Sequence, residues 1–226
     1  MRLKLAIVGV VLLVLLAGCT TAFNADPAEV EQSVVEQQNY EQVEQDVIEF
    51  NETIKITTFE QDVSFSSWIT EYEKRDTSNS DLYSDDYAPI NYVAISTPSM
   101  EIGGVEFNPL DTMADNSSVD VLELFNEERT NNETDDDYRD ARTNSEDFEI
   151  HDRVDEIELN HSQEDTNITV FKYNATFYDD EMGAQFDGFI YTSTLEKDDS
   201  YIVMVGGFPE MFDEEEAMFE LMKNTS

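Results

Sequence analysis

The stretch that decides the fold is ITVFKYNATFYDDEMGAQFDGFIYTSTLEKDDSYIVMVGG, residues 168–207. It contains three runs rich in β-branched and aromatic residues, which favour strands, at residues 168–177, 184–195 and 201–207. Two acidic pairs, Asp179-Asp180 and Asp198-Asp199, separate these runs and are typical of turns. We therefore predict a meander of three antiparallel strands that ends at Phe208-Pro209.

The chain before this meander carries further strand signals. Alternating or continuous apolar residues indicate extended structure over residues 54–56, 63–72, 90–95 and 148–159. Residues 40–50 fit either a helix or a strand, and we favour a strand. Gln61-Asp62 marks the turn of one hairpin, and Gly103-Gly104 marks the turn of another over residues 100–107. Together these segments predict a twisted antiparallel sheet of about six or seven strands.

Three segments have the signals of helices that would flank this sheet. Asp26-Pro27 has an N-cap residue before a proline, which predicts an N-terminal helix. Asn116 or Ser117 can cap a central helix, and Asp213 with Glu216 has the spacing of a capping box for a C-terminal helix. One face of that last helix carries Met218, Leu221 and Met222. We therefore predict a single α+β domain over residues 27–226.

The N-terminus has the parts of a lipoprotein signal peptide. Arg2 and Lys4 supply positive charge, residues 5–17 are apolar, and Leu16-Ala17-Gly18-Cys19 has the form of a lipobox. As a helix the apolar run would rise about 20 Å, short of the roughly 30 Å that a transmembrane segment must cross. We predict a signal peptide over residues 1–18, a lipid on Cys19 and a short tether over residues 19–26. A plain transmembrane anchor is the alternative, and either anchor places the domain on the extracytoplasmic face of the cell membrane.

Acidic residues far outnumber basic ones. The chain has 52 Asp and Glu against 12 Lys and Arg, which gives a net charge of −40. Such a chain repels nucleic-acid phosphates, so nucleic acid is excluded as a partner. Near 1 M salt the Debye length falls to about 3 Å, and the repulsion among carboxylates is screened. Because hydrophobic residues still make up 40% of the chain, we predict a folded protein of an extreme halophile.

Asparagine sequons support an external location. The chain contains more Asn-X-Ser/Thr triplets than its composition predicts, and such triplets are acceptors for N-glycans on surface proteins. The candidate sites are Asn51, Asn116, Asn132, Asn160, Asn167, Asn174 and Asn224. We expect several of them to be used.

A series of short motifs follows in a fixed order along the chain. They are Trp68-x3-Tyr72-Glu73-Lys74, Ala94-Ile95-Ser96-Thr97-Pro98, Phe107-Asn108-Pro109-Leu110, Tyr173-Asn174-Ala175-Thr176, Asp199-Ser200-Tyr201-Ile202-Val203 and Gly206-Gly207-Phe208-Pro209. Over residues 28–224 this order resembles an uncharacterised family of haloarchaeal lipoproteins with a domain of unknown function. The chain departs from that family in lacking a twin-Arg signal and in having Ser67 where the family has Asn. The layout resembles, more weakly, the PsbP-like sandwich of small exported lipoproteins.

Signals for chemistry are few, and we predict no catalytic residue, metal site or cofactor. His151 and His161 could bind zinc or act as a general base with Asp152 or Glu164, but the sequence does not require them to converge. Acidic clusters could bind Ca²⁺ or Mg²⁺, although a chain this acidic forms clusters in any case; they lie at residues 135–137, 179–181 and 213–216. Four aromatic residues could line a pocket for an apolar or sugar ligand or simply pack the sheet, namely Trp68, Tyr72, Tyr83 and Tyr87.

These observations favour a lipid-anchored extracytoplasmic module that binds a small solute or an envelope protein and is not an enzyme. A surface hydrolase with paired carboxylates is one alternative, and it would need a cleft in which two partly buried carboxylates converge. A structural protein of the cell envelope is the other alternative.

Overall fold

The protein is mostly β-structure. The computed structural model describes residues 21–56, 59–75, 90–102, 105–107, 148–164, 166–179, 183–197 and 199–226. Most of the described residues lie in strands, and only two helices occur among them. The predicted α+β class with three flanking helices is therefore wrong, and the expected central helix near Asn116 lies outside the described residues.

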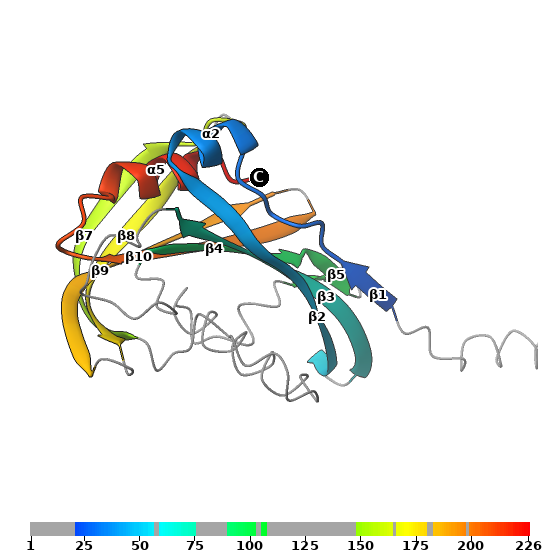
Figure 1. Cartoon of the computed structure of the whole chain (residues 1–226). Helices are drawn as coiled ribbons and strands as arrows, with labels where there is room; N and C mark the ends of the chain where they lie inside the picture. Colours follow the sequence, from blue (N-terminus) through cyan, green and yellow to red (C-terminus); the bar gives the residue numbers. More distant parts are fainter. Residues whose placement is uncertain are drawn as a thin grey trace, which may run out of the picture.

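Eight strands form one curved sheet (Figure 1). They are β1 (Thr21–Asn24), β2 (Tyr40–Ile56), β3 (Phe59–Lys74), β4 (Asn91–Pro98), β7 (Phe148–Asn160), β8 (Asn167–Asp179), β9 (Ala184–Glu196) and β10 (Ser200–Pro209). The order across the sheet is β1-β3-β4-β10-β9-β8-β7. Strand β2 also pairs with β3, on the side opposite to β1 and β4. A separate hairpin, β5 (Met100–Ile102) and β6 (Val105–Phe107), confirms the hairpin predicted around Gly103-Gly104.

The sheet is mixed rather than antiparallel, because its first strand runs parallel to β3. Thr21 pairs with Val63 and Asn24 pairs with Ser66. Strand β1 thus occupies residues within the stretch expected to be a tether. Sequence patterns miss this strand because four residues carry too little periodicity to predict a pairing partner.

The first hairpin is longer than its pattern suggested. Gln61 pairs with Ile54 and Asp62 pairs with Thr53, so the predicted turn at Gln61-Asp62 lies inside β3. Pairing instead continues to Ile56, which lies opposite Phe59. Polar residues are tolerated here because β2 is an edge strand, where the sequence needs no strict apolar alternation.

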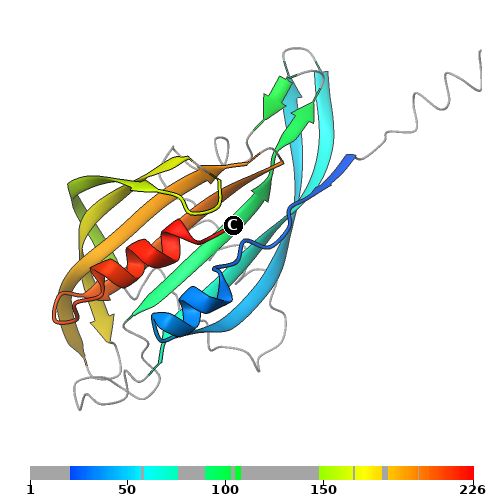
Figure 2. The ribbon, with the colours of Figure 1, turned by 90° about the horizontal axis from the view of Figure 1, so that it is seen from above.

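Both helices lie on the same face of the sheet, as Figure 2 shows. They are α2 (Gln32–Gln37) and α5 (Glu215–Lys223). Met218, Leu221 and Met222 of α5 are fully buried in a core with Tyr92 and Met204 of the sheet. The inner face predicted for the last helix is therefore confirmed.

The predicted helix starts are displaced. Helix α2 begins at Gln32 rather than at Asp26-Pro27, because tertiary hydrogen bonds hold the preceding segment extended. The Ala25 N–H donates to Ser66 O at 3.2 Å, and Ser96 Oγ donates to Asp26 O. Helix α5 begins after Glu214 with no side-chain cap, so the capping box expected between Asp213 and Glu216 does not form.

The opposite face of the sheet carries a second apolar core. Alternate residues of the central strands point there, with Val93 and Ile95 from β4 and Val203 and Val205 from β10. All four side chains are buried. The central strands are thus buried on both faces, which explains their nearly continuous apolar sequences.

No helix among the residues that the structure describes is long and apolar enough to cross a membrane.

Candidate functional site

Two adjoining hollows lie at the end of the sheet where β9 turns into β10. The larger has a volume of about 690 Å³ and the smaller about 270 Å³. Lys197 and Asp199, which lie between the end of β9 and the start of β10, line both hollows. These two hollows are a candidate site for a small ligand in the described part of the structure.

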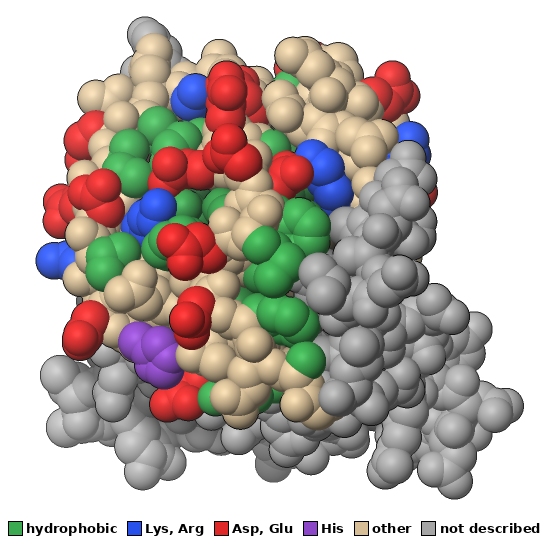
Figure 3. Space-filling view, turned by 60° about the vertical axis from the view of Figure 1, so that its left-hand side comes forward, with side chains coloured by type: hydrophobic (Ala, Val, Ile, Leu, Met, Phe, Trp, Pro, Cys, Tyr) green, Lys and Arg blue, Asp and Glu red, His purple; other side chains and the backbone are tan. Residues whose placement is uncertain are grey.

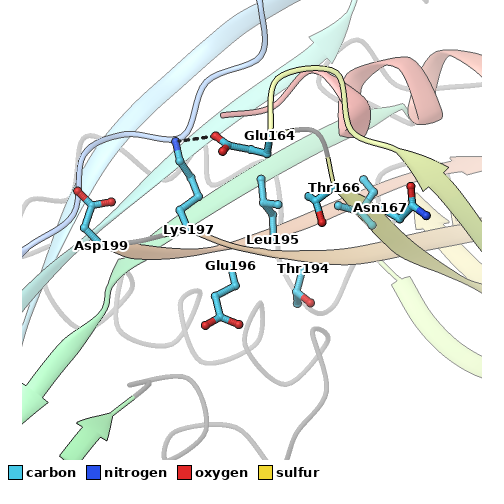
Figure 4. A pocket seen from close by; sticks show the side chains of 9 residues that line it. Glu164, Thr166, Asn167, Thr194, Leu195, Glu196, Lys197 and Asp199 are labelled. Carbon is cyan, nitrogen blue, oxygen red and sulfur yellow. Dashed lines mark ion pairs between the residues drawn. The ribbon is translucent and has the colours of Figure 1, made fainter.

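The larger hollow is built from the ends of neighbouring elements (Figure 4). Ile168 of β8 and Leu195 of β9 are buried apolar residues that line it. Thr166 and Asn167 add polar groups from the start of β8, and Glu164 comes from the turn after β7. The hollow therefore combines apolar and hydrogen-bonding groups, as sites for small ligands commonly do.

Backbone hydrogen bonds fix the turn that carries Lys197. The Lys197 N–H donates to Ser200 O at 2.8 Å. The Ser99 N–H donates to Asp199 O at 2.9 Å and ties the turn to the chain that follows β4. The lysine is thus presented from a well-bonded backbone.

The ammonium of Lys197 makes a loose ion pair. Lys197 Nζ lies 3.6 Å from Glu164 Oε1, and the two side chains are 28% and 37% exposed. The same kind of pair is much closer elsewhere, with Lys74 Nζ at 2.6 Å from Glu214 Oε2. A distance of 3.6 Å is too long for a hydrogen bond, so both groups keep bonding capacity.

The lining carboxylates do not all converge. In Figure 4 the side chains of Lys197 and Leu195 point to one side of β9, and those of Glu196 and Thr194 point to the other. Alternate side chains of a strand face opposite ways, so Glu196 points away from Glu164. Glu164 and Glu196 therefore do not form the convergent carboxylate pair that a hydrolase would need.

The two histidines lie apart and have different surroundings. His151 is exposed on β7, where Nε2 lies 2.9 Å from Thr176 Oγ1. His161 is buried, with Nε2 at 2.8 Å from Thr225 O, and Nδ1 accepts the backbone N–H of Glu164 at 3.2 Å. His161 therefore fastens the turn after β7 to the end of the chain.

No cluster of three or more metal-ligating side chains occurs within the described residues. Two residues of the acidic cluster at residues 213–216 make ion pairs, Glu214 with Lys74 and Glu215 with Lys172. The cluster at residues 135–137, and residues 180 and 181 of the second cluster, lie outside the described part.

Of the four aromatic residues that could line a pocket or pack the sheet, Tyr72 packs the sheet. Tyr72 is buried, and its hydroxyl accepts the Val30 N–H at 2.9 Å. Its ring contacts that of Tyr92 with centroids 6.0 Å apart, so Tyr72 packs the core under α2. Tyr83 and Tyr87 lie outside the described residues.

The expected modification sites fall into three groups. Cys19, Asn116 and Asn132 lie outside the described residues. The exposed asparagines are Asn51, Asn160, Asn167 and Asn174. Asn224 is only 7% exposed, and its Nδ2 donates to Glu220 O at 2.7 Å, which leaves no room for a sugar in this conformation.

On the face of the molecule that Figure 3 shows, carboxylates are spread out rather than gathered in one patch. Figure 3 shows acidic side chains dispersed among apolar, polar and a few basic ones on one face of the molecule. This dispersion agrees with a solvated acidic surface.

The sequence reasoning did not single out Lys197. The signal that could have indicated it is the scarcity of lysine. The chain has only six lysines among 52 Asp and Glu, so a lysine on the surface is an uncommon positive charge. Glu164 was considered only as a partner for histidine. Its approach to Lys197 depends on two turns far apart in sequence, which spacing does not reveal.

The chain matches a known protein family. A family model described as a domain of unknown function matches residues 27–226. No curated protein and no solved structure matches the chain.

Proposed function

We propose a function from the premise that this chain belongs to the DUF6517 family, whose model covers all but the first 26 residues. The expected resemblance to an uncharacterised family is confirmed at that level. We propose that the protein is a lipid-anchored extracytoplasmic module of an extreme halophile, and that it binds a small polar solute in the hollows around Lys197.

The hollow at Lys197 carries this proposal. It joins a volume of about 690 Å³ to hydroxyl, amide, carboxylate and ammonium groups on adjacent elements. Its ammonium lies 3.6 Å from the carboxylate oxygen of Glu164 and makes no hydrogen bond of normal length to the residues that the structure describes. A concave site with few, convergent polar groups is the usual form of a ligand site.

The N-terminal leader sequence supports the proposed location at the membrane. Cys19 follows small residues and precedes β1 by a single residue. A lipidated Cys19 would therefore hold the sheet close to the membrane surface, on the side of the β1 start. Two acyl or ether-linked chains would suffice for stable anchoring.

The net charge of the protein supports the proposed high-salt environment. A net charge of −40 on a folded domain produces strong self-repulsion at low ionic strength, and molar salt screens it. We expect cooperative unfolding in molar KCl and a lower melting temperature at about 0.1 M, where the Debye length is near 10 Å. A melting temperature that does not change with salt would contradict the halophilic assignment.

Anchoring is tested by fractionating cells that produce the wild-type protein or Cys19→Ser. The wild type should sediment with membranes, and the variant should not, because it lacks the thiol that receives the lipid. Ser33→Ala, a change at an exposed position of α2, is the control and should remain with membranes. A Cys19→Ser protein that stays in the membrane fraction would refute the lipid anchor.

Solute binding is tested by capturing the tagged, anchored protein in molar salt and identifying co-purifying small molecules by mass spectrometry. The wild type and Lys223→Met should retain a solute that Lys197→Met loses. Lys223 is a matched control, because it is also 28% exposed and paired with a glutamate but lines neither hollow. A solute kept equally by all three proteins, or by none, would contradict the proposed function.

A further inference from the structure

We propose that the ligand of the larger hollow is a small zwitterion of the α-amino-acid type, with its carboxylate on Lys197 Nζ and its ammonium on the Glu164 carboxylate. This inference rests on the proposed solute-binding function and names the chemical class of the solute.

Lys197 is the lysine, among those whose side chains the structure describes, whose ammonium makes no hydrogen bond of normal length. The side chains of four lysines are described, and three of them lie 2.6–2.7 Å from a carboxylate oxygen: Lys74, Lys172 and Lys223. Lys197 Nζ lies 3.6 Å from Glu164 Oε1. Its ammonium can therefore donate to a ligand carboxylate without giving up a hydrogen bond of normal length.

Glu164 is held beside Lys197 by its own backbone. Its N–H donates to Nδ1 of the buried His161 at 3.2 Å, and the His161 N–H donates to Thr166 O at 2.8 Å. The Glu164 side chain lines the hollow, is more than one-third exposed, and points its carboxylate toward the Lys197 ammonium (Figure 4). It can thus accept hydrogen bonds from a ligand ammonium while its main chain stays fixed.

The spacing of the two protein charges suits a zwitterion. An α-amino acid carries its ammonium and carboxylate on one carbon, so its charges are also close together. Laid head to tail against Lys197 and Glu164, it would offer each protein group an opposite charge. Charge-assisted hydrogen bonds of this kind are the strong ones and need close contact.

The overall charge of the protein disfavours ligands that carry only a negative or only a positive charge. An anion would have to approach a chain of net charge −40. A cation would compete with molar potassium or sodium for every carboxylate. A neutral zwitterion avoids both costs, and its contact hydrogen bonds survive where the Debye length is about 3 Å.

The apolar part of the hollow limits the side chain of the ligand. Ile168 and Leu195 are 2% and 4% exposed and line the hollow next to the ion pair. A methyl or other short apolar group could contact them. We therefore choose L-alanine as the probe.

The test is a titration of the purified protein with L-alanine in molar KCl, followed by calorimetry or by NMR shifts of residues 164–168 and 194–199. Acetate and ethylamine, which each carry one of the two charges, are titrated in parallel. We expect L-alanine to bind more tightly than either. Lys197→Met and Glu164→Gln should each weaken binding by about tenfold or more, and Lys223→Met should leave it unchanged. Unchanged melting temperatures would show that the variants remain folded.

The outcomes separate the inference from the proposed function. Saturable binding of L-alanine that both hollow variants weaken supports the inference. Binding of acetate as tight as that of L-alanine, or L-alanine binding that the variants do not change, overturns it. If L-alanine fails to bind while another solute is captured in a Lys197-dependent manner, the zwitterion is wrong and the solute-binding function stands. If neither occurs, both are refuted.

Discussion

Tyr92 Oη lies 2.6 Å from Thr225 Oγ1 inside the core, and this contact joins β4 to the residues that follow α5. Thr225 Oγ1 also donates to Leu221 O at 2.9 Å, so the proton of the shorter bond comes from Tyr92. His161 Nε2 bonds Thr225 O from a third element at 2.8 Å. Thr225 is completely buried and connects the sheet, the last helix and the turn after β7.

Removing the Tyr92 hydroxyl should weaken this connection. Tyr92→Phe leaves Thr225 Oγ1 buried without its donor, and we expect the free energy of unfolding to fall by about 1–2 kcal/mol. Tyr40→Phe is the matched control, because the buried Tyr40 Oη has no hydrogen-bond partner within the part of the chain that the structure describes. That change should be neutral or stabilising. Chemical unfolding in molar salt measures both, and an equal loss in the two variants would contradict the assigned bond.

Lys172 should contribute more to stability than another lysine of the same domain. Its Nζ lies 2.7 Å from Glu215 Oε1 and 4.0 Å from the centre of the Phe189 ring, and it thereby attaches the start of α5 to β8 and β9. Lys172→Met should lower the free energy of unfolding by about 1–2 kcal/mol. Lys223→Met breaks a pair within α5 and should cost less than about 0.5 kcal/mol. Similar losses in thermal melts of both variants would refute this ranking.

Glu215 should make the fold sensitive to acid. The hydrogen bond from Lys172 holds the pKa of this carboxyl below its usual value of 4.5, although partial burial opposes the shift. A carboxyl with a lowered pKa in the folded state stabilises that state above pH 4.5 and loses this contribution as the pH falls through the folded-state pKa. Melting temperatures of the wild type should therefore fall more steeply below pH 4.5 than those of Glu215→Gln. Glu220→Gln should follow the wild type, and identical profiles for Glu215→Gln and wild type would contradict the coupling.

Gly188 should tolerate no side chain. A Cβ there would lie 2.6 Å from a ring carbon of Phe177 and 2.7 Å from Pro209 Cα, so packed groups would have to move. We expect Gly188→Ala to cost several kcal/mol and to impair folding, as overpacking of a dense core does. Gly183 has φ +62° and open space where a Cβ would lie, so Gly183→Ala should cost only about 1–2 kcal/mol of backbone strain. Expression yield and melting temperature are measured for both variants. Equal values for Gly188→Ala and Gly183→Ala would contradict the prediction.

Sugar occupancy should follow exposure. Asn51, Asn160, Asn167 and Asn174 present exposed side chains, whereas the Asn224 amide is buried and bonded to Glu220 O. Glycopeptide mass spectrometry of the protein from its native membrane should find sugar on exposed sites and none on Asn224. A glycan on Asn224 of the folded protein would show that the end of the chain adopts another conformation.

The strands of the meander were predictable from local sequence. The predicted runs 168–177, 184–195 and 201–207 lie within β8, β9 and β10. β-branched and aromatic residues bounded by acidic turn pairs leave few alternatives to a strand. The helix face of Met218, Leu221 and Met222 was predictable for a similar reason, because a spacing of three and four residues places side chains on one side.

The ends of the helices and the pairing partners of strands distant in the sequence could not be predicted from local sequence. Asp26-Pro27 has a good helix-start signal, yet hydrogen bonds to Ser66 and Ser96 keep that segment extended. Asp213 and Glu216 have capping-box spacing, yet the glutamates between them pair with Lys74 and Lys172 of the sheet. In both cases contacts with distant residues outweigh a local preference of about 1 kcal/mol.

By itself the sequence determined the acidic character of the chain, its leader-like N-terminus and most of its strands, since charge, hydropathy and β-propensity are properties of neighbouring residues. Only the tertiary structure decided the parallel pairing of β1 with β3, the burial of His161 and Thr225, and the approach of Lys197 to Glu164. These contacts join residues from different turns and strands. Their geometry follows from how the whole sheet curves and packs, which no local pattern specifies.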